Sequence, residues 1–367
     1  MANGAVVIDN GSGYIKAGRA GDGEPRTVFP TLVGIPKHAS VAGGATMYVG
    51  QEAQDRRGIL RLNHPIEHGI INDWDDLAEI WTHTFSELRV ASQDQPVLFT
   101  EASLNPNANR ERLASIMFDD FGAPAIYVAN QALLSLHASG RASGVVVDIG
   151  DSATCVTPIQ QGTLLSGAVR RLRVAGRDIT DHLLWILQDS DLKFTTSAEY
   201  QIVVDIKEAL CYVALNHDEE MSKNPEGKAY DLPGGQVIQI GNERFRAPEL
   251  LFSPKLGGLE SDGLIEVIHD SINKCGEDIR SEMYGNIILA GGSTLFPGMK
   301  DRLEQDLSKL APAGTKVQVI APANRKYSAW VEGSKFASQS NFSDLCCSKA
   351  EYDEHGPSIF QKKFQQV

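Results

Sequence analysis

Short apolar runs that end in an aspartate and a glycine-rich turn recur along the chain. Residues 5–13 read AVVIDNGSG and residues 144–152 read GVVVDIGDS, and a second apolar run follows each turn. Apolar runs bounded by glycine are typical of strands buried in a covered sheet. The two segments lie about 140 residues apart, which predicts two strand–turn–strand hairpins, one opening each half of a duplicated chain.

A third glycine turn, residues 291–294, follows the apolar run 287–290 and precedes a helical pattern at residues 298–310. Residues 196–199 read TSAE, which matches a capping box and predicts the start of another helix. The apolar positions at helical spacing after that start are Ile202, Val203, Ile206, Leu210 and Val213. Strands that alternate with helices in this way indicate an α/β protein.

Two segments predict irregular structure. Residues 38–48 (HASVAGGATMY) are small, polar and glycine-rich, so we expect a mobile loop there. Residues 216–227 (NHDEEMSKNPEG) are almost entirely polar, so we expect an exposed connection.

Composition narrows the functional classes. A chain of 367 residues is long enough for roughly two or three domains, and its 42% hydrophobic and 22% charged residues are typical of a globular protein. The formal net charge of −13 argues against a surface for nucleic acid or for anionic membranes.

The cysteines and the apolar runs predict the compartment. No CxxC pair is present, so a reducing environment is the simplest home for the five cysteines, Cys155, Cys211, Cys275, Cys346 and Cys347. The first residues lack the pattern of a signal peptide, and no apolar run approaches the roughly 18 residues that span a bilayer. The sequence therefore predicts a cytoplasmic protein without membrane insertion.

The two hairpin turns are candidates for phosphate binding. A turn of small residues leaves backbone N–H groups pointing into one concavity, which binds phosphate oxygens. Ser12 and Ser152 would add hydroxyl donors and Lys16 a positive charge, while Asp9 and Asp148 end their strands and would face each other across a cleft. Paired carboxylates beside phosphates suit Mg²⁺. One Asp-x-Gly turn is usually only a turn, but two matched hairpins and a third glycine turn favour a clamp for a nucleoside triphosphate.

Other nucleotide-binding and hydrolytic classes lack their motifs. The chain has no GxxxxGK[ST] P-loop, and no GxGxxG that opens a helix with an acidic residue about 20 positions later. It also has no HExxH zinc motif and no GxSxG nucleophile turn.

Taken together, these stretches resemble the actin family, and the likeness runs from Ala5 to Phe364. The segments that carry it stand in the family's order: DNGSGYIKAG (9–18), RRGILRLNHPIEHGI (56–70), PVLFTEASLNPNANRE (96–111), DIKEALCYVAL (205–215), IGNERFRAPE (240–249), AGGSTLFPG (290–298), IAPANRKYSAW (320–330) and SKAEYDEHGPSI (348–359).

The resemblance implies an α/β protein with the actin/Hsp70/sugar-kinase fold, in which two lobes with duplicated mixed β-sheet cores enclose a nucleotide cleft. The implied outer lobe comprises residues 1–138 and 328–367, and its small subdomain at 31–64 carries the mobile loop 38–48. The implied inner lobe comprises residues 139–327, with a small subdomain at 175–259.

The resemblance also implies ATP or ADP with Mg²⁺ (or Ca²⁺) in the cleft and assigns residues to it. The implied phosphate loops contain Ser12, Gly13, Tyr14, Lys16, Asp151, Ser152 and Ala153. The implied adenosine pocket contains Lys207, Glu208, Gly292, Leu295, Phe296 and Lys326. Asp9, Asp148 and Gln131 would hold the hydrated metal and orient the attacking water, and the catalytic positions are Gln131, Asp148 and Cys155. His68 matches the family's sensor histidine.

Several residues depart from the family's pattern. Cys155 stands where actins have a histidine that helps to place the water, so we expect slower or differently timed hydrolysis. Ser152 replaces a glycine, and Val204 replaces an arginine beside the adenine. The loop 38–48 is shorter and less apolar than in actins. In the cleft that binds many actin regulators, the replacements are His137, Lys335 and Gln339.

The sequence therefore predicts a divergent, actin-like, ATP-binding cytoskeletal protein of the cytoplasm. It would assemble into filaments, act as a slow ATPase coupled to polymerisation, and bind actin regulators with altered specificity, but not nucleic acid. One alternative is an actin-related protein that is a fixed subunit of a complex and polymerises little. Another is a solitary ATPase or phosphotransferase of the same fold.

Overall fold

The structure is a computed structural model, and it describes residues 4–38, 46–189, 192 and 194–364. Most of the predicted loop at 38–48 lies outside these residues. None of the helices in the described part of the chain is both long and apolar enough to cross a membrane.

The first large sheet has six strands in the order β19-β10-β9-β1-β2-β3. Its hairpin pairs β1 and β2 in antiparallel fashion, and β9 and β10 extend the sheet parallel to β1. The bounds are β1 Val6–Asn10, β2 Tyr14–Arg19, β3 Thr27–Pro30, β9 Val97–Glu101, β10 Ala125–Asn130 and β19 Cys347–Ser348.

The second large sheet repeats this arrangement. Its order is β13-β12-β11-β17-β18, with β14 paired to β12, and β17 and β18 extend it parallel to β11. The bounds are β11 Gly144–Ile149, β12 Thr154–Gln160, β13 Thr163–Leu164, β14 Arg170–Leu172, β17 Ile287–Ala290 and β18 Val319–Ile320. The run β3-β2-β1-β9-β10 therefore matches β14-β12-β11-β17-β18, and the duplicated sheet cores predicted from the two hairpins are confirmed.

Smaller sheets lie outside these two cores. One has the order β5-β4-β6, and two more are the pairs β7–β8 and β15–β16. The bounds are β4 Val33–Pro36, β5 Tyr48–Val49, β6 Leu60–Asn63, β7 Ile66–Glu67, β8 Ile70–Ile71, β15 Lys228–Asp231 and β16 Val237–Ile240.

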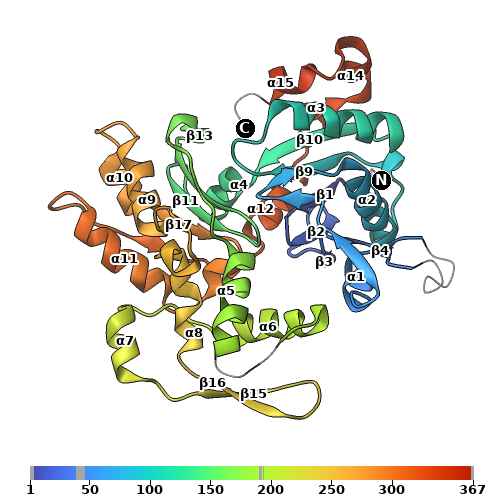
Figure 1. Ribbon diagram of the computed structural model, residues 1–367. Coiled ribbons are helices and arrows are strands. Elements are labelled where there is room, and N and C mark those ends of the chain that lie inside the picture. The colour runs from blue at the N-terminus through green and yellow to red at the C-terminus, as the bar shows by residue number, and fades with distance from the viewer. Residues whose placement is uncertain (1–3, 39–45, 190–191, 193, 365–367) are drawn as a thin grey trace.

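The helices cover both faces of the sheets (Figure 1). Their bounds are α1 Gly50–Asp55, α2 Trp74–Leu88, α3 Asn107–Ser115, α4 Gln131–Ala138, α5 Gly176–Asp189, α6 Ser197–Leu210, α7 His217–Lys223, α8 Glu243–Arg246, α9 Leu264–Asn273, α10 Arg280–Gly285, α11 Met299–Leu310, α12 Ser328–Ala337, α13 Phe342–Leu345, α14 Lys349–His355 and α15 Ile359–Lys363.

Helix α4 lies between the two large sheets (Figure 1). Its Leu134 packs in a cluster with Val7 and Leu98 of the first sheet. Its Ala132 and Leu136 pack in another cluster with residues of the second sheet. Alternation along β1 explains the first contact, because Val6 and Ile8 face the opposite cluster under α2. The helix therefore joins the hydrophobic cores of the two halves.

Of two local predictions, the capping box at residues 196–199 is confirmed and the connection at residues 216–227 is wrong in part. The capping box is confirmed, because Thr196 caps α6 and Glu199 bonds back to it, although Val213 lies beyond the end of that helix. The connection predicted at residues 216–227 is wrong in part, because it contains α7. Asn216 caps this helix, acidic residues fill its first turn and Lys223 its last, so hydrogen bonds and the helix dipole stabilise it without an apolar face.

Candidate functional site

Three turns meet at the ends of β1, β11 and β17. A β-carbon on Gly13 would lie 2.6 Å from Cβ of Asp151, so the first two turns approach this closely because residue 13 is glycine. Gly291 has a φ of +83°, and a β-carbon there would lie 2.4 Å from Oδ1 of Asp148. The glycines therefore allow the three strand ends to close around a single cavity.

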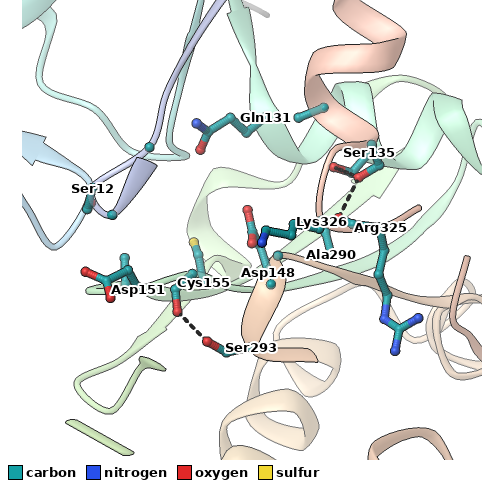
Figure 2. A pocket seen from close by; sticks show the side chains of 18 of the residues that line it. Ser12, Gln131, Ser135, Asp148, Asp151, Cys155, Ala290, Ser293, Arg325 and Lys326 are labelled. Carbon is teal, nitrogen blue, oxygen red and sulfur yellow. Dashed lines mark hydrogen bonds between the residues drawn. The ribbon is translucent and has the colours of Figure 1, made fainter. Parts of the chain in front are cut away.

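This cavity has a volume of about 280 Å³ and is lined from both halves of the chain. Figure 2 shows Gln131 on one side and Asp148, Asp151 and Cys155 on the other. The structure brings nearly all the predicted site residues to its wall: Asp9, Ser12, Gly13, Tyr14, Lys16, Gln131, Asp148, Asp151, Ala153, Cys155, Lys207, Glu208, Gly292, Leu295, Phe296 and Lys326.

Ser152 does not line the cavity, unlike the other predicted phosphate-loop residues. Its hydroxyl accepts a hydrogen bond from the backbone N–H of His68 at 3.0 Å, and its carbonyl oxygen lies 2.7 Å from Nδ1 of His68. The hydroxyl therefore holds the loop at residue 68 instead of pointing to the cavity, where the sequence placed it as a donor.

Asp9 is held by hydrogen bonds on both carboxylate oxygens. Nζ of Lys16 lies 2.7 Å from Oδ2, while Nε2 of Gln131 donates to Oδ1 at 2.9 Å and the hydroxyl of Thr100 also donates to Oδ1. Burial alone would raise the pKa of Asp9, but the charge of Lys16 and these hydrogen bonds lower it below its usual value. Asp9 is therefore a fixed negative charge.

Asp148 faces the same cavity in a different environment. Within the described residues, no hydrogen bond to its carboxylate is found. Burial raises the pKa of Asp148 from 3.8 to about 6, with Lys16 lowering it and Asp9 raising it. A carboxylate without a hydrogen-bond partner beside a cluster of backbone turns suits a divalent cation and its bound waters.

Cys155 sits directly opposite Asp148 in the antiparallel register of β11 and β12. Its Sγ lies 3.5 Å from Oγ1 of Thr157, two residues along the same face of the strand. Burial raises the pKa of the Cys155 thiol, so the thiol is neutral near pH 7. Position 155 therefore offers the cavity a weak donor and no charge.

The other end of the cavity combines an apolar surface with lysines. Leu295 is 40% exposed and Phe296 lies beside it, while Nζ of Lys326 lies 5.7 Å from the ring centre of Tyr14. Lys207 is buried, and its Nζ donates to the carbonyl of Gly176 at 2.9 Å and to the hydroxyl of Thr180 at 2.7 Å. An aromatic base and a ribose fit this mixture of exposed apolar and polar groups.

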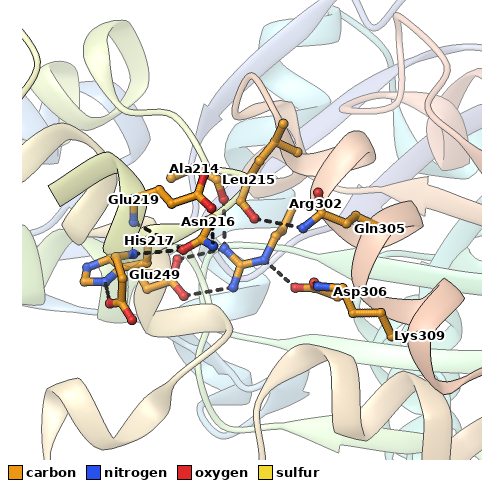
Figure 3. Close-up of polar contacts among 11 residues, drawn as sticks. Ala214, Leu215, Asn216, His217, Glu219, Glu249, Arg302, Gln305, Asp306 and Lys309 are labelled. Atoms are coloured by element: carbon orange, nitrogen blue, oxygen red, sulfur yellow. Dashed lines mark hydrogen bonds and ion pairs between the residues drawn. The ribbon is translucent and has the colours of Figure 1, made fainter. Parts of the chain in front are cut away.

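A partly buried ion-pair network supports this end of the cavity (Figure 3). Arg302 of α11 donates to both oxygens of Glu249, at 3.0 and 3.1 Å, and to the carbonyl of Ala214 at 2.8 Å, and it also pairs with Asp306. Next to Ala214, the N–H of Val213 bonds to the carbonyl of Pro297, which lines the cavity. The network therefore fixes the chain behind Phe296 and Pro297.

Sequence reasoning missed several polar residues at the site. Thr100 bonds to Asp9 and Gln131, Ser135 bonds to Ser328 at 3.0 Å, and Ser293 donates to the carbonyl of Gly150 at 2.8 Å. Figure 2 shows Ser135 and Ser293 at the wall of the cavity. The sequence does not show these contacts, because each partner lies far away along the chain.

The environment of Asp148 predicts a pH-dependent stability. Because the pKa is raised in the folded protein, ionisation destabilises the fold above pH 6, and the effect fades as pH falls through 6 and is gone below about 4. We expect Asp148→Asn, without nucleotide and with a chelator, to raise the free energy of unfolding by about 1–3 kcal/mol at pH 8 and by almost nothing at pH 4. Urea unfolding at both pH values measures this.

The matched control is Asp231→Asn, which changes an exposed aspartate on β15. It should alter the free energy of unfolding little at either pH value. An Asp148→Asn protein with no gain at pH 8, or with the same gain at pH 4, would contradict the raised pKa.

The comparison with known protein families agrees with this geometry. A family model described as Actin matches residues 1–365. The match covers essentially the whole chain, and the duplicated sheets have the arrangement of the actin/Hsp70/sugar-kinase fold. Proteins of this family generally bind ATP or ADP with a divalent cation, for which the wall of the cavity is suited. The chain belongs to the actin family.

Proposed function

We propose that this protein binds ATP with Mg²⁺ (or Ca²⁺) in the cavity, hydrolyses it slowly and assembles into filaments as it does so. The observation that carries the proposal is the meeting of two hairpin turns over one cavity, with Gln131 and Asp148 on opposite sides of it. The family match supports the nucleotide, whereas assembly and its coupling to hydrolysis are our inference.

Different groups of residues would bind the phosphates and the nucleoside of ATP. Backbone N–H groups of residues 11–14 and 151–153, with the hydroxyl of Ser12 and the ammonium of Lys16, would hold the phosphates. The base and ribose would lie against Gly292, Leu295 and Phe296, within reach of the polar groups Lys207, Glu208 and Lys326. These residues all line the cavity, except Ser152.

Hydrolysis requires a water in line with the terminal phosphate. Gln131 is too weak a base to take a proton, so we assign it the orientation of this water. As the water oxygen bonds to the γ-phosphorus, the bond to the β-phosphate oxygen breaks and the water's proton leaves to Asp148 or to solvent. A divalent cation near Asp9, Asp148 and Gln131 would neutralise phosphate charge. Cys155 contributes only a weak donor, which accounts for slow turnover.

We assign the two lobes the boundaries of the family pattern: residues 1–138 with 328–367, and residues 139–327, with small subdomains at 31–64 and 175–259. Two helices that pack against each other support this division, because α4 ends at Ala138 and α12 begins at Ser328. The cavity would then lie between the lobes.

The exposed side chains and the net charge indicate which partners the protein binds. We propose self-assembly and binding of actin regulators with altered specificity, in the cytoplasm and cytoskeleton. Lys335 on α12 is mostly exposed and paired with Glu332 at 3.3 Å. A regulator that buries an apolar helix against His137, Lys335 and Gln339 would have to desolvate this lysine, which disfavours binding. The net charge of −13 disfavours nucleic acid.

The proposal is tested by phosphate release from Mg-ATP across a series of protein concentrations. If hydrolysis is coupled to assembly, release should stay low up to a threshold concentration and rise steeply above it. Release strictly proportional to protein would instead indicate a solitary ATPase or phosphotransferase. A protein that stays monomeric on size exclusion with Mg-ATP and releases little phosphate would indicate a fixed subunit of a complex.

Gln131→Ala should slow phosphate release above the threshold several-fold, because the water loses its orienting group. Binding of ATP, measured by displacement of a fluorescent analogue, should stay within about twofold, since orientation of the water is a separate task from holding the phosphates. The control is Gln188→Ala, an exposed residue on α5, which should behave as wild type. An unchanged rate of phosphate release in Gln131→Ala would contradict the role assigned to Gln131.

Cys155→His should speed hydrolysis if the weak thiol limits it, because imidazole is a stronger hydrogen-bonding and proton-accepting group near pH 7. Single-turnover hydrolysis in assembled protein measures the step. Cys155→Ser, which nearly keeps the size and replaces the neutral thiol by a neutral hydroxyl, should not give the same gain. An unchanged rate in Cys155→His would show that residue 155 is not what limits hydrolysis.

A further inference from the structure

We propose that Thr100 is a positioning residue that fixes which end of the Gln131 amide faces the cavity. Thr100 is 2% exposed and is not part of the cavity wall, so it acts through Gln131 and not on the nucleotide. The inference rests on the proposed function and names a device by which the same site orients its water.

The strand register places Thr100 between the two groups it contacts. Strand β9 lies between β1 and β10, all three parallel, and Thr100 stands next to the pairs that join Phe99 to Ile8 and Val128. Asp9 therefore lies on one side of Thr100. On the other side, Asn130 caps α4 by accepting hydrogen bonds from two backbone N–H groups, which fixes Gln131 as the first residue of the helix.

The hydrogen bonds leave one consistent arrangement of donors. The ionised carboxylate of Asp9 can only accept, so Thr100 gives its one hydroxyl proton to Oδ1. The Thr100 oxygen then has lone pairs alone to offer Gln131, whose amide lies 3.1 Å away. Oδ1 of Asp9, 2.9 Å from the same amide atom, likewise accepts. Both contacts require the NH₂ group of Gln131, so its carbonyl oxygen is directed elsewhere.

The orientation matters because the two ends of a glutamine amide are almost equal in size but opposite in hydrogen bonding. A carbonyl oxygen accepts a hydrogen bond from a nearby water and leaves a lone pair of that water free to attack phosphorus. An NH₂ group would donate to that lone pair and compete with the attack. Thr100 and Asp9 therefore select the productive orientation together, because both accept from the NH₂ group. Lys16, which holds Oδ2 of Asp9 at 2.7 Å, keeps the carboxylate from rotating away.

The test compares Thr100→Val, which keeps the shape and removes the hydroxyl, with Thr100→Ser, which restores it. Single-turnover hydrolysis and the Kd for Mg-ATP are measured in full-length protein above its threshold concentration. We expect Thr100→Val to hydrolyse roughly fivefold to tenfold more slowly with its Kd within twofold of wild type, because positioning is lost and phosphate binding is kept. Thr100→Ser should recover most of the rate.

Two controls separate positioning from a general effect on the fold. Thr84→Val removes another buried hydroxyl, which donates to the carbonyl of Ile80 at 2.7 Å in α2, and should leave the rate unchanged. The double variant Thr100→Val/Gln131→Ala should be no slower than Gln131→Ala alone, because residues that act as one unit are not additive. If Thr100→Val does not fold, Thr100→Cys, which keeps the size but bonds weakly, takes its place.

The outcomes separate this inference from the proposed function. A normal rate in Thr100→Val, when Gln131→Ala is slow, would overturn the role of Thr100 and leave the function standing. Fully additive losses in the double variant would also overturn it, because Thr100 would then act through Asp9. Normal rates in both single variants would overturn the proposed role of Gln131, and the inference with it.

Discussion

The hydrogen bonding of Asp9 is the interaction on which the rest of the cavity depends. Lys16 occupies one carboxylate oxygen, and Thr100 and Gln131 occupy the other, so a single charge on β1 ties together β2, β9 and the start of α4. Asp148 occupies the matching strand end in the second sheet, and the structure gives it no such partners among the described residues. Partners, and not residue type, therefore give the two aspartates different properties.

The position of α4 connects this chemistry to the shape of the molecule. Gln131 is the first residue of the helix, Leu134 packs on the first sheet, and Ala132 and Leu136 pack on the second. Because packed side chains have few alternative arrangements, a change in the angle between the sheets must move or repack this helix. Gln131 moves with it, which gives the proposed coupling of assembly and hydrolysis a physical route.

The sequence predicts those parts of the fold and site that depend on local signals. The hairpins and the third turn follow from apolar runs with glycine at fixed places, and each forms as expected. Helix α7 was missed because none of its residues is buried, so it lacks the apolar periodicity by which helices are found, although Asn216 supplied a capping signal. The hydrogen bond of the Ser152 hydroxyl could not be predicted, because its partner, His68, is 84 residues away. Thr100 forms a hydrogen bond with Asp9, 91 residues away in the sequence, and no local pattern predicts such a contact.

Cys155, which departs from the actin pattern, alters the chemistry of the cavity through a single side chain. Register fixes this position opposite Asp148, so the residue faces the cavity whatever its type. A substitution there changes the proton chemistry without changing the course of the chain. Because burial keeps the thiol of Cys155 neutral, it neither accepts the water's proton readily nor stabilises negative charge. In the proposed reaction the proton must then leave to Asp148 or to solvent, and the water depends more heavily on Gln131 for its orientation. The neutral thiol therefore makes the hydrogen bonds that fix Gln131 more important to this protein.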